Sequence, residues 1–183
     1  MTRVNPVSPA DASEQVSGMF AEIKGAFGVV PKMFQVTGNS PAALASMWGS
    51  FGALGAGTLD AKLGEQIAVA VANANSCAYC LSAHTALGRK AGASQDEMSE
   101  AQLGSSSNPR TAAALTFALE LVEKRGHVSD ADMRAIAAAG YTEGEIVEIV
   151  AHVALNLFTN YINVALEVPN DFPVVSFRAP AAA

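Results

Sequence analysis

The sequence predicts an all-α fold in a single domain, and three observations support that prediction. No segment alternates apolar and polar residues beside an enrichment in β-branched side chains, and no Asn-Gly or Asp-Gly hairpin turn occurs. Apolar residues recur instead at helical spacing through most of the chain. Residues that cap helices precede several of these apolar segments. At 183 residues the chain is long enough to bury a substantial core as one domain.

The first half of the chain contains four expected helices and a short turn. Gly28 ends the first apolar repeat, and Ser40 before Pro41 is a cap with proline in the first helical turn. Asp60 is a capping residue for the next helix. The asparagines and serine of residues 73–76 favour caps over helix interiors, so they predict a break before a new helix. The expected helices are 12–27, 41–55, 60–72 and 76–90, with a short turn from residue 31.

The second half contains four further helices. Ser129 caps a short one, and Thr142 with Glu145 forms a capping box at the start of the longest. The serine-rich stretch 104–109 is the clearest internal loop. The expected helices are 94–100, 111–124, 129–140 and 142–166. We divide the chain into a flexible N-terminal segment at 1–10, a helical domain at 11–173 and an extended or disordered tail at 174–183.

Composition and charge exclude some partners and indicate others. The 11 Lys and Arg against 17 Asp and Glu give a net charge of -6 without any basic run, which argues against nucleic-acid binding. Charged residues make up only 15% of the chain while 50% are hydrophobic, so we expect part of the surface to be covered by copies of the same chain. No secretory signal is recognisable at the N-terminus, and a cytoplasmic location is expected.

The most apolar stretch, residues 146–168, is predicted to be a buried helix and not a membrane span. Six polar side chains interrupt it, which a lipid-facing segment would rarely tolerate. Four of them are spaced four, four and three residues apart and form a polar stripe along one helix face. We expect this stripe to face another helix, another subunit or a pocket beside the two cysteines, Cys77 and Cys80. The residues of the stripe are His152, Asn156, Asn160 and Asn163. Tyr161 is expected in the core.

The two cysteines form the most informative motif. Cys77 and Cys80, with His84 one turn further on, project within an arc of about 60° if they share one helix. With Ser76 as the N-cap, Cys77 is the first helical residue and Cys80 lies in the first turn, where the helix dipole favours an anion. Both thiol pKa values are therefore expected to be lowered, and His84 is positioned to take up a thiol proton.

Glu65 is the fourth candidate of the site. On one unbroken helix, twelve residues would turn it about 120° away from Cys77, so it reaches the cysteines only if the chain bends at residues 73–76. A carboxylate there would orient the imidazole of His84 or end a proton relay. Two other interpretations of the four side chains remain open: a mixed metal site and a structural or degenerate thiol pair.

Glu65, the Cys77-Ala78-Tyr79-Cys80 motif, His84 and Gly88 together resemble the core motif of the alkylhydroperoxidase D-like branch of the carboxymuconolactone decarboxylase superfamily. The similarity to the peroxidase-related subgroup extends over most of residues 20–175, including the segments 31–34, 39–41, 160–163 and 171–173. The resemblance implies an alkylhydroperoxidase D-like helical bundle that assembles as a trimer or hexamer.

The same resemblance implies a thiol-dependent peroxidase that uses a small-molecule hydroperoxide, an unknown thiol reductant and no metal or organic cofactor. Cys80 would be the peroxidatic thiol and Cys77 the resolving thiol, while His84 and Glu65 would relay protons. Tyr79 stands where the best-known members have histidine, and a phenol is a poor base near neutral pH. Two alternatives are a non-catalytic or redox-sensing helical oligomer and a carboxymuconolactone-type decarboxylase.

Overall fold

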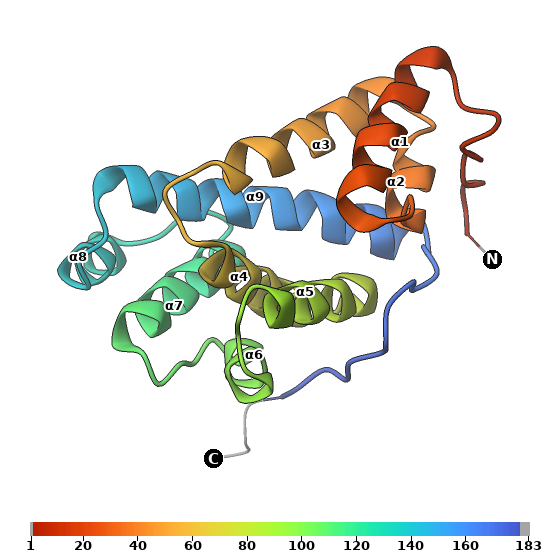
Figure 1. Cartoon of the computed structure of the whole chain (residues 1–183). Helices are drawn as coiled ribbons and strands as arrows, with labels where there is room; N and C mark the ends of the chain where they lie inside the picture. The colour runs from red at the N-terminus through yellow and green to blue at the C-terminus, as the bar shows by residue number, and fades with distance from the viewer. Residues whose placement is uncertain (1, 180–183) are drawn as a thin grey trace.

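The computed structural model describes residues 2–179, and these residues form nine α-helices and no strand (Figure 1). The all-α prediction is confirmed. The helices are α1 (Glu14–Phe27), α2 (Lys32–Thr37), α3 (Pro41–Gly55), α4 (Ala61–Ala74), α5 (Ala78–Lys90), α6 (Gln95–Ala101), α7 (Pro109–Glu123), α8 (Asp130–Ala138) and α9 (Glu143–Ala165).

The ends of the expected helices lie within two residues of the observed ones. Two differences concern the expected turn and the expected loop. The turn expected from Pro31 continues as the six-residue helix α2. Helix α7 begins at Pro109, inside the predicted loop, because the Asn108 side chain accepts hydrogen bonds from the backbone N–H groups of Arg110 and Thr111. Proline suits the first position of a helix, since the N–H group it lacks would have no partner there.

Helix α4 is the centre of the fold and packs against α5, α6, α7 and α9. Nine of its 14 residues are buried, and Ile67, Val69 and Val71 have no exposed surface. Figure 1 shows α1 and α2 at one end of the molecule and α7 with α8 at the other, with α3 and the 23-residue helix α9 running between them. Because α9 contacts both ends as well as α4 and α5, it brings its polar stripe into the middle of the protein.

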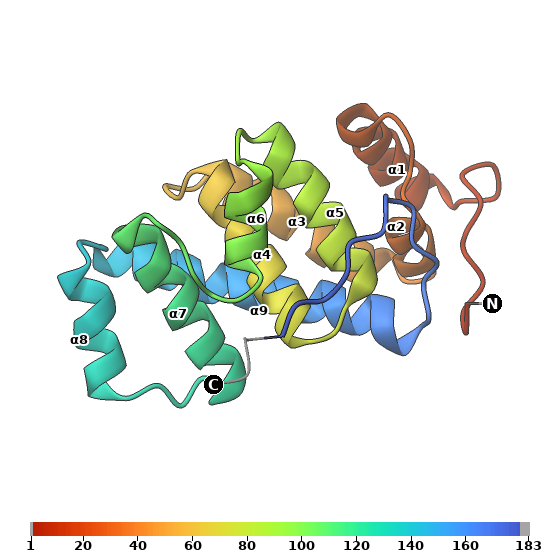
Figure 2. The same cartoon turned by 90° about the horizontal axis from the view of Figure 1, so that it is seen from below.

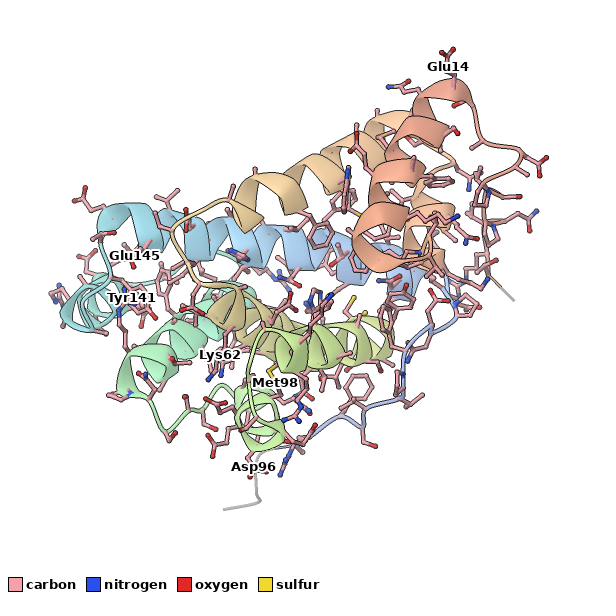
Figure 3. The ribbon with its side chains drawn as sticks, in the orientation of Figure 1. Glu14, Lys62, Asp96, Met98, Tyr141 and Glu145 are labelled. Carbon is pink, nitrogen blue, oxygen red and sulfur yellow. The ribbon has the colours of Figure 1, made fainter. Side chains whose placement is uncertain are left out.

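Polar contacts tie the outer helices to this centre. The Arg110 guanidinium lies 4.0 Å above the Tyr141 ring and pairs with Glu145 at 2.6 Å, which holds α7 against the start of α9. Lys62 of α4 pairs with Glu97 of α6, and the buried Met98 points from α6 toward the α4–α5 pair (Figure 3).

The segments outside the helices lie on the helical body. Arg3 and Val7 donate backbone hydrogen bonds to Leu166 and Gln35, each at 3.0 Å. Residues 169–179, which we call the C-terminal strap, run along α5 (Figure 2). The tail at 174–183 was predicted to be extended or disordered. Its residues 174–179 belong to the strap, which has no helix, and its residues 180–183 lie outside the described part of the chain. Flexibility at 1–10 stays a prediction. Between residues 2 and 179 no helix combines the length and apolar character needed to cross a membrane.

Candidate active site

Helices α4 and α5 fold back on one another around a tight turn at Asn75, Ser76 and Cys77. Ser76 has φ +54°, in the left-handed region, and Cys77 has the extended backbone typical of an N-cap. The bend predicted at residues 73–76 is therefore confirmed. The prediction that Ser76 is the N-cap is wrong: Cys77 takes that position, and its Sγ accepts the backbone N–H of Cys80 at 3.3 Å.

The turn brings Glu65 of α4 against His84 of α5. Glu65 Oε2 lies 2.7 Å from His84 Nδ1. Gly88, one turn beyond His84, permits this close packing: a Cβ there would lie 3.3 Å from Glu65 Cβ and 2.5 Å from Met98 Cε. The carboxylate and the imidazole thus lie at a close helix contact in which a Cβ at residue 88 would displace Met98 and crowd Glu65.

The two sulfurs occupy different environments. Both cysteines are free thiols and both are buried. Cys80 faces a cavity of about 30 Å³ that His84 also lines, whereas Cys77 is not part of its wall. The cavity is otherwise apolar and is formed mainly by aromatic side chains. Its walls are Phe27, Pro31, Met33, Phe34, Phe51, Tyr79, Ala83, Leu87 and Phe172. A reactant in this cavity meets Cys80 first.

Cys80 has the properties of a nucleophile. Burial alone would raise the pKa of its thiol, but a hydrogen bond from Cys77, the positive charge of His84 and the amide of Asn163 outweigh it and lower the pKa to about 7. Asn163 Nδ2 donates to Cys80 Sγ at 3.1 Å. The side chain of Asn160 lowers the same pKa further, although its amide nitrogen lies outside ordinary hydrogen-bonding geometry.

Cys77 behaves in the opposite way, so the prediction that both thiols have lowered pKa values is wrong for this residue. Its hydrogen bond to Cys80, burial and the negative charge of the Cys80 thiolate all raise the pKa of the Cys77 thiol far above its usual range. The N-cap contact with the Cys80 N–H opposes the shift without overcoming it. Cys77 therefore stays protonated, and its S–H group donates a hydrogen bond to the Cys80 sulfur.

The surroundings of His84 favour the protonated form of its imidazole. Burial would lower the pKa of its imidazole, but the charge and hydrogen bond of Glu65 and the charge of Cys80 raise it. A raised histidine pKa keeps the imidazolium form present at higher pH. The structure thus brings together all four residues predicted from the sequence, with Cys80 and His84 at the cavity and Cys77 and Glu65 behind them.

Asn163 was predicted as part of the polar stripe, for which the pocket beside the cysteines was one of three expected neighbours, and the structure confirms that neighbour for its amide. Its spacing from His152 indicated a buried face, but nothing in the motif marks an amide 83 residues beyond Cys80 as its partner. Of the other members of the stripe, Asn160 Oδ1 accepts from Asn75 and Asn156 donates to the backbone oxygen of His152, whereas His152 Nε2 is buried without a hydrogen-bond partner. The expectation of Tyr161 in the core is wrong, since it is 62% exposed.

Tyr79 does not point its hydroxyl at the sulfurs. It donates a hydrogen bond to Asp171 Oδ2 at 2.8 Å, and the same oxygen accepts the backbone N–H of Lys32 at 2.6 Å. Burial and this carboxylate raise the pKa of Tyr79 well above its ordinary value. Tyr79 therefore connects α5 to α2 through the C-terminal strap. Its hydroxyl keeps its proton at neutral pH because its pKa is raised. Among residues 2–179, no three His, Cys, Asp or Glu side chains are arranged to hold a metal ion.

Comparison with known proteins shows what the chain is similar to. Residues 41–124, a little under half of the chain, include α3 to α5 and all four site residues and match the carboxymuconolactone decarboxylase family. No curated protein matches the chain.

Solved structures extend the similarity beyond the family segment. A peroxidase-related protein with an alkylhydroperoxidase AhpD core, from Ralstonia eutropha JMP134, is 27% identical, with a TM-score of 0.83 over 93% of each chain. A peroxidase-related protein from Silicibacter sp. TM1040 is 21% identical, with a TM-score of 0.80 over 92% of this chain and 91% of that one. The debrominase Bmp8, in complex with 2,3,4-tribromopyrrole, is 23% identical, with a TM-score of 0.80 over 93% and 92%. The chain thus has an AhpD-like helical fold.

Proposed function

We propose that this chain is a thiol-dependent peroxidase that reduces hydroperoxides through Cys80 and Cys77. The observation that carries the proposal is the position of Cys80: it is the thiol that faces the cavity, beside a protonated His84, with its pKa lowered to about 7. A thiolate at neutral pH is the reactive form of cysteine toward a peroxide oxygen. The peroxidase-related protein at 27% identity supports the same chemistry.

In the first step the Cys80 thiolate attacks the terminal oxygen of the hydroperoxide. A sulfur–oxygen bond forms and the oxygen–oxygen bond breaks, which leaves Cys80 as a sulfenic acid and the substrate as an alkoxide. His84 lines the same cavity and donates its proton to the alkoxide. Glu65 keeps the imidazole protonated and oriented before the transfer.

In the second step Cys77 attacks the sulfenic sulfur. A disulfide forms, and the sulfenic oxygen leaves as water with the proton that Cys77 carried. The contact between the Cys77 sulfur and the Cys80 N–H already places the two residues in one helical turn. An external dithiol then reduces the disulfide and is itself oxidised. We propose a reducing compartment, the cytoplasm, for this cycle.

The cavity favours a peroxidase over the lactone decarboxylation in the family's name. A carboxylated lactone carries both a carboxylate and a ring ester, so it needs several cationic or hydrogen-bonding side chains. The cavity contains Cys80, His84 and the already bonded hydroxyl of Tyr79, with an otherwise apolar wall. Turnover of such a lactone by a protein without either thiol would support decarboxylation. For a non-catalytic thiol pair, slow alkylation of Cys80 with a midpoint near the ordinary pKa of about 8.5 is expected.

The proposal is tested by hydroperoxide consumption with a dithiol reductant for the wild type, Cys80→Ser and Cys77→Ser. We expect no turnover from Cys80→Ser. Cys77→Ser should react once and accumulate a sulfenic acid that a dimedone probe captures. Equal rates for all three proteins would exclude the mechanism, and a sulfenic acid trapped at Cys77 in Cys80→Ser would reverse the roles of the thiols.

A further inference from the structure

The C-terminal strap is attached to α5 on both sides of Phe172. Before it, Asn170 donates to Ser82 Oγ at 2.9 Å. After it, the backbone N–H of Val175 donates to the same oxygen at 3.2 Å. Asp171 adds the bonds to Tyr79 and to the first residue of α2. These contacts fix the position of Phe172, although it belongs to no helix.

Phe172 forms one wall of the cavity at Cys80. Its ring meets the Tyr79 ring edge-on, with centroids 5.7 Å apart. The other walls belong to α1, α2 with its N-cap Pro31, α3 and α5. Tyr79 is buried in the core, while Phe27, Phe51 and Phe172 are partly buried and pack against it. Of these rings, Phe172 differs in that no helix carries it.

The cavity volume of about 30 Å³ has room for about two water molecules. That space accommodates a peroxide group but not a bulky substituent attached to it. A larger substituent must extend out through the open side of the cavity or occupy the position of one of the walls. The cavity is narrow, and Phe172 comes from the strap and not from a helix. Together these two features define a limit on the size of the substituent that can enter.

We propose that Phe172 is the specificity-determining residue of this site and sets the largest substituent that a hydroperoxide can carry to Cys80. The inference rests on the proposed peroxidase function. Ser82 and Asp171 are positioning residues, because they hold the strap on both sides of the ring. Removal of the ring should open the cavity to substrates that the wild type excludes.

The first test measures steric access without any peroxide. Cys80 is alkylated in the Cys77→Ser background with iodoacetamide and with its bulkier N-phenyl analogue, iodoacetanilide. In Phe172→Ala the rate ratio of the large to the small reagent should rise about tenfold, the scale on which apolar pockets discriminate by size. Phe177→Ala is the matched control, because Phe177 lies on the same strap, is 45% exposed and does not line the cavity.

The second test compares kcat/KM for cumene hydroperoxide and hydrogen peroxide in proteins that retain both cysteines. Phe172→Ala should raise the ratio about tenfold and Phe172→Leu, which keeps an apolar anchor, by less. Peroxide turnover with unchanged ratios in both variants overturns the size limit alone. Absence of peroxide turnover in the wild type overturns the proposed function and, with it, the limit for hydroperoxides. A shift as large in Phe177→Ala also overturns the assignment to Phe172.

Discussion

Asn163 should control the ionisation of Cys80, and Asn163→Leu isolates its contribution. The amide donates to the Cys80 sulfur at 3.1 Å from a position that is 4% exposed. A hydrogen bond to a charged group contributes about 1.5–3 kcal/mol. Since one pKa unit corresponds to about 1.4 kcal/mol, its loss should raise the pKa of Cys80 by about one to two units from its value of about 7.

The assay is the pH dependence of Cys80 alkylation in the Cys77→Ser background, which gives a midpoint for each protein. At pH 7 the thiolate fraction should fall from about one half to between a tenth and a hundredth. Each remaining thiolate reacts about threefold faster per unit of pKa, so the midpoint is a better measure than the rate at one pH. The fold should tolerate the substitution, because Asn163 Oδ1 is buried without a hydrogen-bond partner and leucine removes that unpaired oxygen.

Asn156→Leu is the matched control for this prediction. Asn156 is on the same helix, is equally buried at 4% exposure, and bonds only to the backbone of its own helix. Its midpoint should stay at the value of the parent protein. An unchanged midpoint in Asn163→Leu would refute the electrostatic explanation, and equal shifts in both variants would point to a general effect of disturbing α9.

Three further predictions concern the relay, the packing and the assembly. Glu65→Gln should lower the pKa of His84 and raise that of Cys80, and imidazole NMR measures the first of these. In the wild type the raised histidine pKa contributes stability that is fully present below pH 6.5 and is lost as pH rises through the pKa of the folded state. Glu65→Gln should remove this contribution, which unfolding at several pH values measures. Gly88→Ala should lower the free energy of unfolding by about 1–3 kcal/mol because Met98 and Glu65 obstruct a Cβ. Gly18→Ala, with open space around it, should raise that free energy by about 0.5–1 kcal/mol in the same urea titration. We propose that the chain forms a trimer or hexamer through the exposed apolar face of α9. Tyr161→Lys should then shift the sedimentation of the protein toward that of the 18.8 kDa monomer. A wild-type protein that sediments as a monomer would contradict the proposed assembly.

The helices could be predicted well because their signals are local. A cap such as Ser129 or Thr142 bonds to the residue three positions later, and apolar periodicity describes one face of one helix. The same locality explains the errors. Serine at residue 76 is a good cap by type, but the turn places its backbone in the left-handed region and leaves the cap to Cys77.

By itself the sequence determined the helical class, the bend between α4 and α5 and the four residues that meet beside it, because these depend on residues close together in the chain. Only the tertiary structure decided which thiol is ionised and how large its cavity is. The pKa of a sulfur depends on the charges and dipoles within a few ångströms of it, and here those include an amide 83 residues away. The cavity wall likewise depends on a strap that contacts α5 only once the chain has folded.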